Sequence, residues 1–127
     1  MTRKTKGQIE ADVSKAVVAF EREYMGRGPI DIKTRLVGDM VLVRLKGILT
    51  PAERHLVKAE GVELIKQVRA KLLEKGQSLL RESVETITGL TVTSMHSDLS
   101  TTSGERIIIF VLSEEIEEKF AGPRNTW

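Results

Sequence analysis

Two segments of this chain carry the same order of hydrophobic patterns, and this doubling limits what the chain can fold into. Residues 8–47 read as an amphipathic helix, a glycine turn and two strands, and residues 62–112 repeat that order with a longer helix and a longer hairpin loop. Four strands with apolar faces need the helices as cover. The repeat therefore predicts an α+β fold: two α-β-β units forming a four-stranded, mainly antiparallel sheet with helices packed on one face.

The first helix is predicted from the spacing of its apolar residues, which form one stripe of a 3.6-residue period. The stripe consists of Ile9, Val13, Ala16, Val17 and Phe20. Thr5 and Gln8 fit a capping box, so the helix is expected to start at residue 6 or 7. The Gly-Arg-Gly-Pro sequence at 26–29 ends it, because glycine accepts left-handed geometry and proline cannot continue a helix.

The next two strands are predicted together with their register. Residues 30–36 and 40–46 alternate with period two around Gly38-Asp39, which fits a two-residue hairpin loop. Residue 37 then pairs with 40, 35 with 42, 33 with 44 and 31 with 46. The expected core face carries Ile30, Ile32, Thr34, Leu36, Val41, Val43 and Leu45. The opposite face carries Asp31, Lys33, Arg35, Leu42, Arg44 and Lys46.

The second helical region begins at a clear start signal. Thr50 is the predicted N-cap, Pro51 occupies the first helical position, and Glu53 completes a capping box with Thr50. Gly61 divides a short helix from a long one of about 25 residues, nearly 40 Å in length. Its expected apolar stripe is Ile65, Val68, Leu72, Leu79, Val84 and Ile87. Strands of eight residues span only roughly 27 Å, so the helix overhangs the sheet and its free end needs a partner.

The last part of the chain supplies a second hairpin and a tail. Residues 90–98 alternate, with Leu90, Val92, Ser94 and His96 expected on one face, and a polar loop follows at 99–105. Residues 106–112 are apolar on both faces, which is typical of a central or doubly covered strand. Residues 113–120 predict one or two turns of acidic helix. A single domain over 1–127 is expected, with its core at about 6–115 and an acidic turn and loose tail over 116–127.

Composition excludes several classes of protein. The 127 residues are 40% hydrophobic and 30% charged, typical of a globular domain. Cysteine is absent, which excludes disulfides, thiolate metal sites and cysteine nucleophiles. No apolar run reaches the roughly 18–20 residues that span a bilayer. The basic start Met1–Lys6 is followed by no apolar signal region, so a cytoplasmic protein is expected.

The positive charge of the first hairpin is the strongest electrostatic feature. Residues 1–50 hold ten Lys/Arg against six Asp/Glu, whereas the remainder holds ten against twelve. The candidate partner-binding residues are Arg27, Lys33, Arg35, Arg44 and Lys46. This basic face is open to two interpretations, a phosphate backbone or a protein partner. Stacking aromatics are scarce and Met40 and Leu42 lie among the charges, so a protein interface is expected and nucleic acid remains the alternative.

The second hairpin carries a polar cluster without a predicted reaction. Ser94, His96 and Asp98 share a strand face, but two-residue spacing separates them by about 6.6–7 Å, too far for a Ser-His-Asp relay. His96 and Asp98, with Glu105 across the hairpin, are the only nucleus for a metal site, and they supply too few ligands. We therefore predict no catalytic residues, no cofactor and no metal. His96, Asp98, Ser100 and Glu105 remain a polar cluster of unknown role.

Several stretches together resemble a known family. They are Lys6-Gly7-Gln8-Ile9-Glu10, Phe20-Glu21-Arg22-Glu23-Tyr24 with the glycine turn at 26–29, Val43-Arg44-Leu45-Lys46-Gly47-Ile48-Leu49-Thr50-Pro51-Ala52-Glu53, and His96-Ser97-Asp98-Leu99-Ser100-Thr101 with Gly104-Glu105. The chain resembles the MpsC family of small bacterial proteins over roughly residues 6–115. The Leu-Lys-Gly-x-Leu-Thr-Pro-Ala-Glu block is the most specific part of the resemblance.

The resemblance implies a role beside a membrane rather than a reaction. The family is named for a sodium-translocating, membrane-potential-generating system linked to bicarbonate and cation transport, and it offers no catalytic residues to carry over. It implies a cytoplasmic accessory or regulatory protein that contacts a membrane transport subunit, at the inner face of the membrane through that partner. The doubly apolar strand 106–112 and the overhanging helix favour a homodimer.

Overall fold

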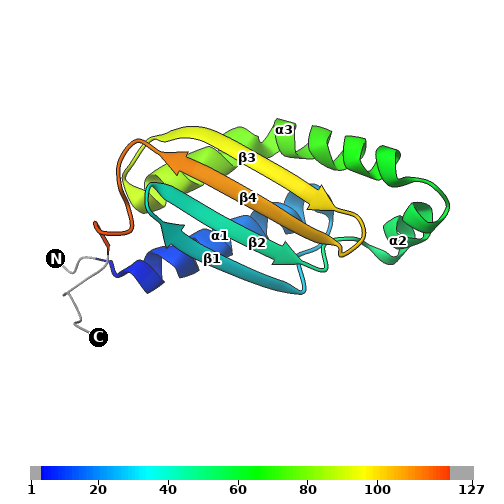
Figure 1. Cartoon of the computed structure of the whole chain (residues 1–127), viewed down its shortest axis with the longest axis horizontal. Coiled ribbons are helices and arrows are strands. Elements are labelled where there is room, and N and C mark those ends of the chain that lie inside the picture. Colours follow the sequence, from blue (N-terminus) through cyan, green and yellow to red (C-terminus); the bar gives the residue numbers. More distant parts are fainter. Residues whose placement is uncertain (1–3, 121–127) are drawn as a thin grey trace.

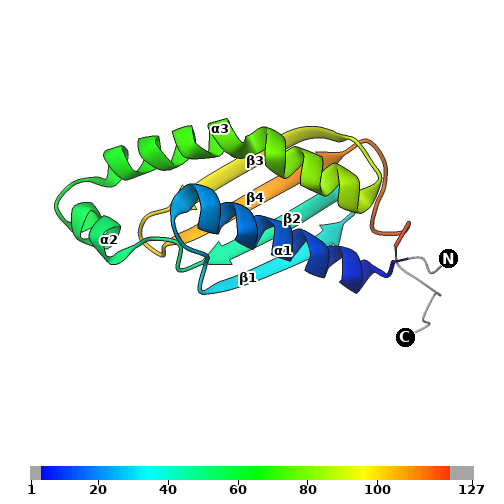
Figure 2. The same cartoon turned by 180° about the vertical axis from the view of Figure 1, so that it is seen from behind.

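A computed structural model describes residues 4–120 and confirms the predicted α+β fold. Within this range, three helices accompany one four-stranded antiparallel sheet, and the two long helices lie on a single face of it (Figures 1 and 2). The elements are α1 (Lys6–Met25), β1 (Asp31–Val37), β2 (Met40–Lys46), α2 (Pro51–Lys58), α3 (Val62–Thr88), β3 (Val92–Ser100) and β4 (Glu105–Leu112).

The sheet has the strand order β1-β2-β4-β3, so each hairpin contributes one central and one edge strand. The predicted register of the first hairpin is confirmed: Val37 pairs with Met40 and Lys33 with Arg44. β4 is central, as its sequence indicated, but helices cover only one of its faces. The placement of Ile30 in the core was wrong. It precedes β1, its N–H donates to the Lys46 carbonyl at 2.8 Å, and its side chain is 72% exposed.

Helix α1 begins and ends as predicted. Thr5 Oγ1 accepts from the Gln8 N–H at 3.2 Å, and Gln8 Oε1 accepts from the Thr5 N–H at 2.8 Å. This reciprocal pair satisfies two of the donors that a helix start leaves free. Gly26 ends the helix in the left-handed region with φ 88°, where a Cβ would be strained. The buried stripe of α1 also contains a residue that the apolar pattern excluded, Glu21.

The predicted stripe of α3 was wrong in part. Val68 and Leu79 are 45% and 47% exposed, whereas the side that faces the sheet and α1 carries polar and small residues between its aliphatic ones. The buried positions are Ile65, Arg69, Leu73, Gly76, Leu80, Val84 and Thr88. They recur every three or four residues, so the helical period was correct. The phase was misjudged because hydrophobicity alone cannot select a buried arginine or glycine.

The second hairpin differs from its prediction through a β-bulge. Val92 pairs with Leu112 and Ser94 with Val111, so the register shifts between these two residues. Val92 therefore faces the core, while Ser94 and His96 lie on the other face, opposite Val111 and Ile109. The prediction that Val92, Ser94 and His96 share a face was wrong because a bulge reverses the alternation that it interrupts.

The acidic segment after β4 is hydrogen-bonded to the β1–β2 turn at Gly38. Residues 117–120 form a turn rather than a helix. The N–H groups of Ile116 and Glu117 donate to the Gly38 carbonyl, and the Gly38 N–H donates to Glu117 Oε1 at 3.1 Å. Lys6 Nζ completes the contact at 3.0 Å from Glu117 Oε2. The predicted loose tail at 121–127 lies outside the described residues.

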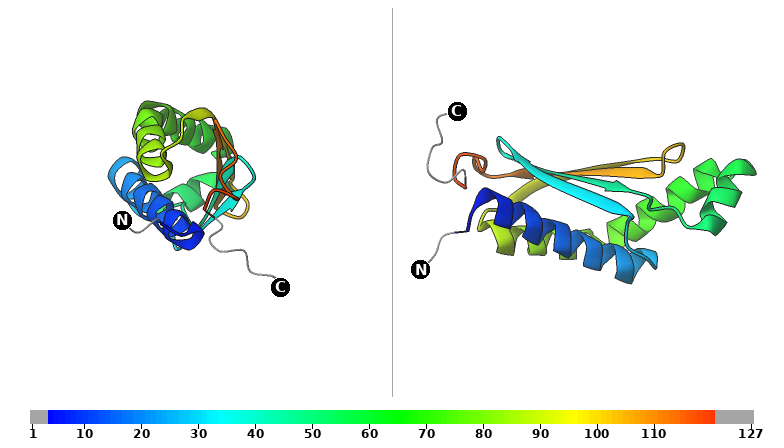
Figure 3. Two further views of the ribbon diagram at one scale, coloured as in Figure 1. Left: turned by 90° about the vertical axis from the view of Figure 1, so that its left-hand side faces the viewer. Right: turned by 90° about the horizontal axis from the view of Figure 1, so that it is seen from below.

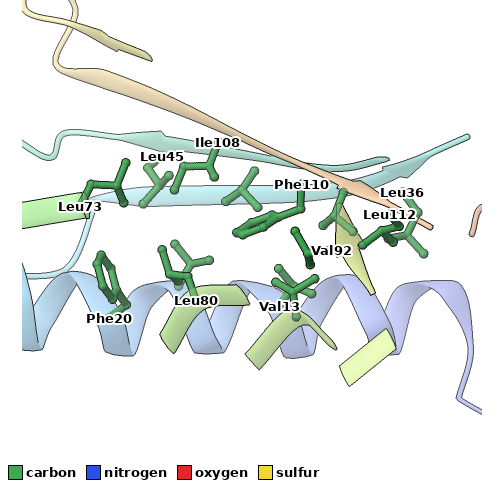
Figure 4. Packing of buried hydrophobic residues seen from close by; sticks show 14 of the residues in the cluster. Val13, Phe20, Leu36, Leu45, Leu73, Leu80, Val92, Ile108, Phe110 and Leu112 are labelled. Atoms are coloured by element: carbon green, nitrogen blue, oxygen red, sulfur yellow. The ribbon is translucent and has the colours of Figure 1, made fainter. Parts of the chain in front are cut away.

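The core fills the space between one sheet layer and one helical layer (Figure 3). α1 packs on the β1 side and α3 on the β3 side, and Phe110 and Val13 meet between the layers (Figure 4). The start of α3 and all of α2 project past the end of the sheet, which confirms the predicted overhang (Figure 1). Within residues 4–120, no helix lies on the opposite face of the sheet.

Candidate functional site

The uncovered outer face of the sheet is ordered by charge from one edge to the other. Its residues stand in three cross-strand rows that run from β1 through β2 and β4 to β3. The rows are Lys33–Arg44–Ile107–Asp98, Arg35–Leu42–Ile109–His96 and Val37–Met40–Val111–Ser94. We call these twelve residues the outer sheet face. Cations occupy the β1 side, aliphatic side chains the centre and polar groups the β3 side.

Four of the five predicted partner-binding cations lie on this face or at its end. Lys33, Arg35, Arg44 and Lys46 are exposed, and Lys46 pairs with Asp31 in the row beyond Lys33. Arg27 is not part of the group. Its Nη2 donates to the Gly47 carbonyl at 2.9 Å and fastens the α1–β1 connection to the end of β2. Its fixed position gives Arg27 a structural role that the sequence did not predict.

The polar cluster of the second hairpin is brought together only in part. Ser94, His96 and Asp98 are outer-face neighbours along β3, and Ser100 pairs with Glu105 at the end of the hairpin. Glu105 Oε2 accepts from Arg44 Nε at 2.8 Å, so Glu105 is paired with a cation of the outer sheet face and not with His96 or Asp98. Among residues 4–120, no group of three His, Asp or Glu side chains is placed to hold a metal ion.

One distance in that cluster departs from the prediction. Ser94 Oγ lies 3.2 Å from His96 Nε2, within hydrogen-bond range, although the strand spacing predicted separation. Backbone spacing places the Cβ atoms far apart, but the side chains lean toward each other along the strand. His96 and Asp98 are nevertheless exposed, and a relay needs a carboxylate that orients a shielded imidazole.

A second polar feature, which the sequence interpretation missed, is buried between the layers. Glu21 of α1, Glu53 of α2, Arg69 of α3 and Arg106 of β4 meet there, and we call them the ionic cluster. Arg69 Nη2 lies 2.5 Å from Glu53 Oε1 and Arg69 Nε lies 2.9 Å from Glu53 Oε2, a two-point contact. Arg69 Nη2 also donates to the Ile48 carbonyl at 2.9 Å.

The other half of the ionic cluster is looser. Glu21 Oε2 lies 3.8 Å from Arg69 Nη1, and Glu21 Oε1 lies 3.8 Å from Arg106 Nε, both beyond hydrogen-bond length. The side chains of Glu21, Arg69 and Arg106 are at most 3% exposed. Within the described chain, both Glu21 oxygens, Arg69 Nη1 and the Nε and Nη2 of Arg106 have no hydrogen-bond partner.

The two glutamates of the cluster have pKa shifts of opposite sign. Burial raises the pKa of Glu21, and the attraction of Arg106 and Arg69 only partly offsets it. Burial also acts on Glu53, but hydrogen bonds from Arg69 and the Thr50 N–H outweigh it and lower the pKa of that carboxyl. Burial lowers the pKa of Arg106. Glu53 is therefore a firm counter-ion for its arginine, and Glu21 is a weak one.

A cavity of about 310 Å³ opens beside the ionic cluster, between the first half of α3 and the strands β3 and β4. Its walls combine cationic and aliphatic side chains, chiefly Lys66, Arg69, Leu73, Met95, Leu99 and Arg106. Arg106 Nη1 also donates to Ser97 Oγ at 3.2 Å on the same wall. The sequence held a signal for Arg106, because it shares strand parity with the buried Ile108 and Phe110.

Comparison with known proteins identifies the family. The family described as "Na+-translocating membrane potential-generating system (MpsC)" matches residues 5–114, most of the chain. The chain belongs to the MpsC family. It is 44% identical over 117 residues to "Uncharacterized protein YbcI" of Bacillus subtilis (strain 168), covering 91% of this chain and 94% of that protein. It is 27% identical over 102 residues to "Uncharacterized protein YrhF" of the same organism, covering 79% and 84%. No solved structure matches.

The block most specific to the MpsC resemblance has a definite place in the structure. It runs from the end of β2 into α2 and includes Ile48 and Glu53, two of the partners of Arg69. Gly47 within it has φ 66°, and a Cβ there would collide with Ile30. The block thus joins the sheet to the ionic cluster. Among residues 4–120 no helix is long and apolar enough to cross a membrane.

Proposed function

We propose that this MpsC-family chain is a non-catalytic, cytoplasmic accessory or regulatory protein of a membrane ion or bicarbonate transport system. It contacts a transport subunit through the outer sheet face and reaches the inner face of the membrane through that partner. The observation that carries this proposal is the outer sheet face itself. A central patch of Leu42, Ile107 and Ile109 with cations along one side has the make-up of a protein interface, an apolar centre with a charged rim.

The same face gives little support to the nucleic-acid alternative. Sheets that bind single-stranded RNA present aromatic side chains on their open face, on which bases stack. Here the central strands present aliphatic residues, and the aromatic residue of β4, Phe110, is fully buried in the core. Phe20 and Tyr24 stack against each other on α1, on the other side of the sheet. Nucleic-acid binding is therefore an outcome of the tests below rather than a second proposal.

An enzymatic role has no support from the polar cluster. His96 and Asp98 are exposed on an edge strand, and the described cavity beside the ionic cluster does not contain His96. We propose that both residues form the polar rim of the interface. A His96→Ala variant should keep full cellular function, and loss of function with an intact fold and intact partner binding would instead indicate chemistry at His96.

The homodimer belongs to the proposal and uses a different surface. Leu64, Val68 and Leu79 are 52%, 45% and 47% exposed on one side of α3. A twofold axis presents the same helix surface on both copies, so this stripe meets its own equivalent. Light scattering should report a dimer for the native chain and a monomer for Val68→Asp, with Ser78→Asp unchanged. A native monomer, or a dimer that survives Val68→Asp, would contradict this assignment.

The partner contact is tested by co-fractionation with native membranes. Lys33→Glu/Arg35→Glu reverses two exposed charges on β1 and leaves the Arg44–Glu105 pair intact. Lys15→Glu/Lys58→Glu makes the same change in net charge on α1 and α2, outside the proposed dimer stripe. We expect the first variant to leave the membrane fraction and the second to stay, with binding of the native protein falling as salt rises. Equal retention of both variants would remove the outer sheet face from the proposal.

A further inference from the structure

The cavity beside the ionic cluster has the features of a ligand site that the proposed contact surface does not use. Its volume of about 310 Å³ lies at the small end of the range for small-molecule sites in proteins. It opens on the core side of β3, whereas the outer sheet face lies on the other side. Asp98, at the rim of the cavity, is the one lining residue that also belongs to the outer sheet face.

The inner wall of the cavity is cationic. Arg69 and Arg106 are almost fully buried, and three of their nitrogens, Arg69 Nη1 and Arg106 Nε and Nη2, have no hydrogen-bond partner among the described residues. Buried polar groups are nearly always paired, and an unpaired guanidinium donor is costly in a low-dielectric interior. An acceptor that reaches these donors would gain charge-assisted hydrogen bonds.

The carboxylate of Glu21 lies beside the two arginines but does not accept hydrogen bonds from their unpaired nitrogens. Glu21 lies 3.8 Å from each guanidinium, beyond hydrogen-bond length, and burial raises the pKa of its carboxyl. Glu53 accepts only from Nε and Nη2 of Arg69 and leaves Nη1 without a partner. Glu74 and Asp98 also line the cavity, but both are exposed at its rim, where water screens their charges. The unpaired guanidinium nitrogens of the inner wall therefore favour an anionic acceptor.

The remaining walls define the rest of the ligand. Leu73 and Leu99 are buried and Met95 is half-buried, and they form an aliphatic surface next to the two guanidinium groups. Lys66 stands at the entrance from α3. Guanidinium forks match carboxylate and phosphate groups geometrically, and aliphatic walls favour a short hydrocarbon chain.

We propose that this cavity binds a small organic oxyanion, with its carboxylate or phosphate group at Arg69 and Arg106 and its apolar part against Leu73, Met95 and Leu99. The ligand would join α3 to β3 and β4 at the end of the molecule where α3 leaves the sheet.

The test uses the full chain and four probes that separate charge from hydrophobicity. Hexanoate and hexyl phosphate carry both features, 1-hexanol lacks the charge and inorganic phosphate lacks the hydrocarbon. We expect calorimetry to show hexanoate or hexyl phosphate binding at least tenfold more tightly than 1-hexanol and inorganic phosphate. The Met95 methyl signal should shift in NMR spectra on addition of the tighter probe. Binding of carboxylate, of phosphate or of both identifies the head group.

Two variants locate the binding without disturbing the arginines. Ala70→Trp fills the cavity from an exposed lining position, and Ser78→Trp adds the same ring elsewhere on α3. Ala70→Trp should weaken binding at least tenfold and Ser78→Trp should not. Glu21→Gln removes the competing carboxylate and should tighten binding several-fold, an effect that a purely structural ionic cluster would not produce.

Three results would overturn the proposal. The first is no heat and no Met95 shift with either charged probe at millimolar concentration. The second is 1-hexanol binding as tightly as hexanoate. The third is Ala70→Trp binding like the native protein. None of these results bears on the outer sheet face, so the two proposals stand or fall separately.

Discussion

The two ends of the space between sheet and helices are built on opposite principles. Near the β1–β2 turn, the inner row of the sheet is Leu36–Val41–Phe110–Met95, and the side chains that meet it are aliphatic (Figure 4). Two rows further along, the inner row is Ile32–Leu45–Arg106–Leu99. Its charged member, Arg106, lies 3.8 Å from Glu21, which lies 3.8 Å from Arg69. The space between the layers thus changes from an apolar core to an ionic cluster beside a cavity.

The comparison suggests that the two ends contribute differently: the apolar end to stability and the ionic end to binding. Apolar burial contributes stability without needing exact pairing, whereas a buried ion pair contributes little net stability and becomes costly when one partner is lost. The apolar end is therefore expected to supply most of the stability of the fold. The ionic end keeps unpaired donors in the interior, which is the kind of local cost that proteins retain at binding sites.

The largest expected effect comes from breaking the apolar end. Phe110 is fully buried, and Phe110→Ala should lower the free energy of unfolding by about 3–5 kcal/mol because it leaves a cavity in a close-packed region. Urea denaturation measures the change. His96→Ala, on the exposed face of the neighbouring strand, should stay within about 0.5 kcal/mol of native. If Phe110→Ala lowered the free energy of unfolding no more than His96→Ala, the apolar end would not be the main source of stability.

At the ionic end, the next largest effect is expected from Glu53. Glu53→Gln leaves the guanidinium of Arg69 buried without its firm counter-ion and should lower stability by about 2–3 kcal/mol near pH 7. The folded-state pKa of Glu53 is lowered, so its charge stabilises the fold above the ordinary value of 4.5 and less as pH falls through the lower folded pKa. The gap between native and variant curves should narrow on acidification below about 4.5.

Glu82→Gln serves as the matched control, because Glu82 is exposed on the same helix as Arg69. Glu82→Gln should leave the free energy of unfolding unchanged both near pH 7 and below about pH 4.5. A gap for Glu53→Gln that stays constant with pH would mean that the glutamate acts through its shape and helix-capping geometry rather than through its charge.

A smaller effect is expected at the boundary between the two ends. Gly76 of α3 faces Phe20 of α1, and a Cβ at this position would overlap the ring. Gly76→Ala should therefore destabilise by about 1–3 kcal/mol through overpacking, despite the better helix propensity of alanine. Gly7→Ala, in the open first turn of α1, should be neutral or slightly stabilising by thermal denaturation. A more stable Gly76→Ala would show that the helices separate easily there.

The smallest effect sharpens the comparison within the ionic end. The pKa of Glu21 is raised in the folded state, so its ionisation makes the fold less stable as pH rises above the ordinary value of 4.5. Glu21→Gln imitates the protonated acid. It should match the native protein near pH 4 and be modestly more stable at pH 7, as judged by urea midpoints. A variant less stable at pH 7 would make Glu21 a true counter-ion, like Glu53.

The sequence was informative wherever the local pattern and the final environment agreed. The two capping boxes, the glycine end of α1 and the register around Gly38-Asp39 are local, and each was predicted correctly. The bulge after Val92 and the phase of α3 were not, because both depend on packing between distant segments. The three cations of the outer sheet face, and Lys46 at its end, followed from strand parity.

The ionic cluster could not be found by a search for apolar stripes. Arg69 and Glu21 are buried only because each lies on the inner side of its helix, and they reach each other across 48 positions of sequence. A rule that assigns buried sites by period alone, without regard to residue type, would have selected Arg106, which alternates with Ile108, Phe110 and Leu112. Pairing of opposite charges at such positions is the signal that the apolar criterion discards.

The most direct test of the proposed function is a pull-down of tagged protein from gently solubilised native membranes, followed by mass spectrometry. Native protein and the Lys15→Glu/Lys58→Glu control should recover an ion-transport subunit in near-stoichiometric amount, and Lys33→Glu/Arg35→Glu should lose it. Recovery of only soluble proteins or nucleic acid by the native protein would contradict the proposal that the outer sheet face contacts a membrane transport system.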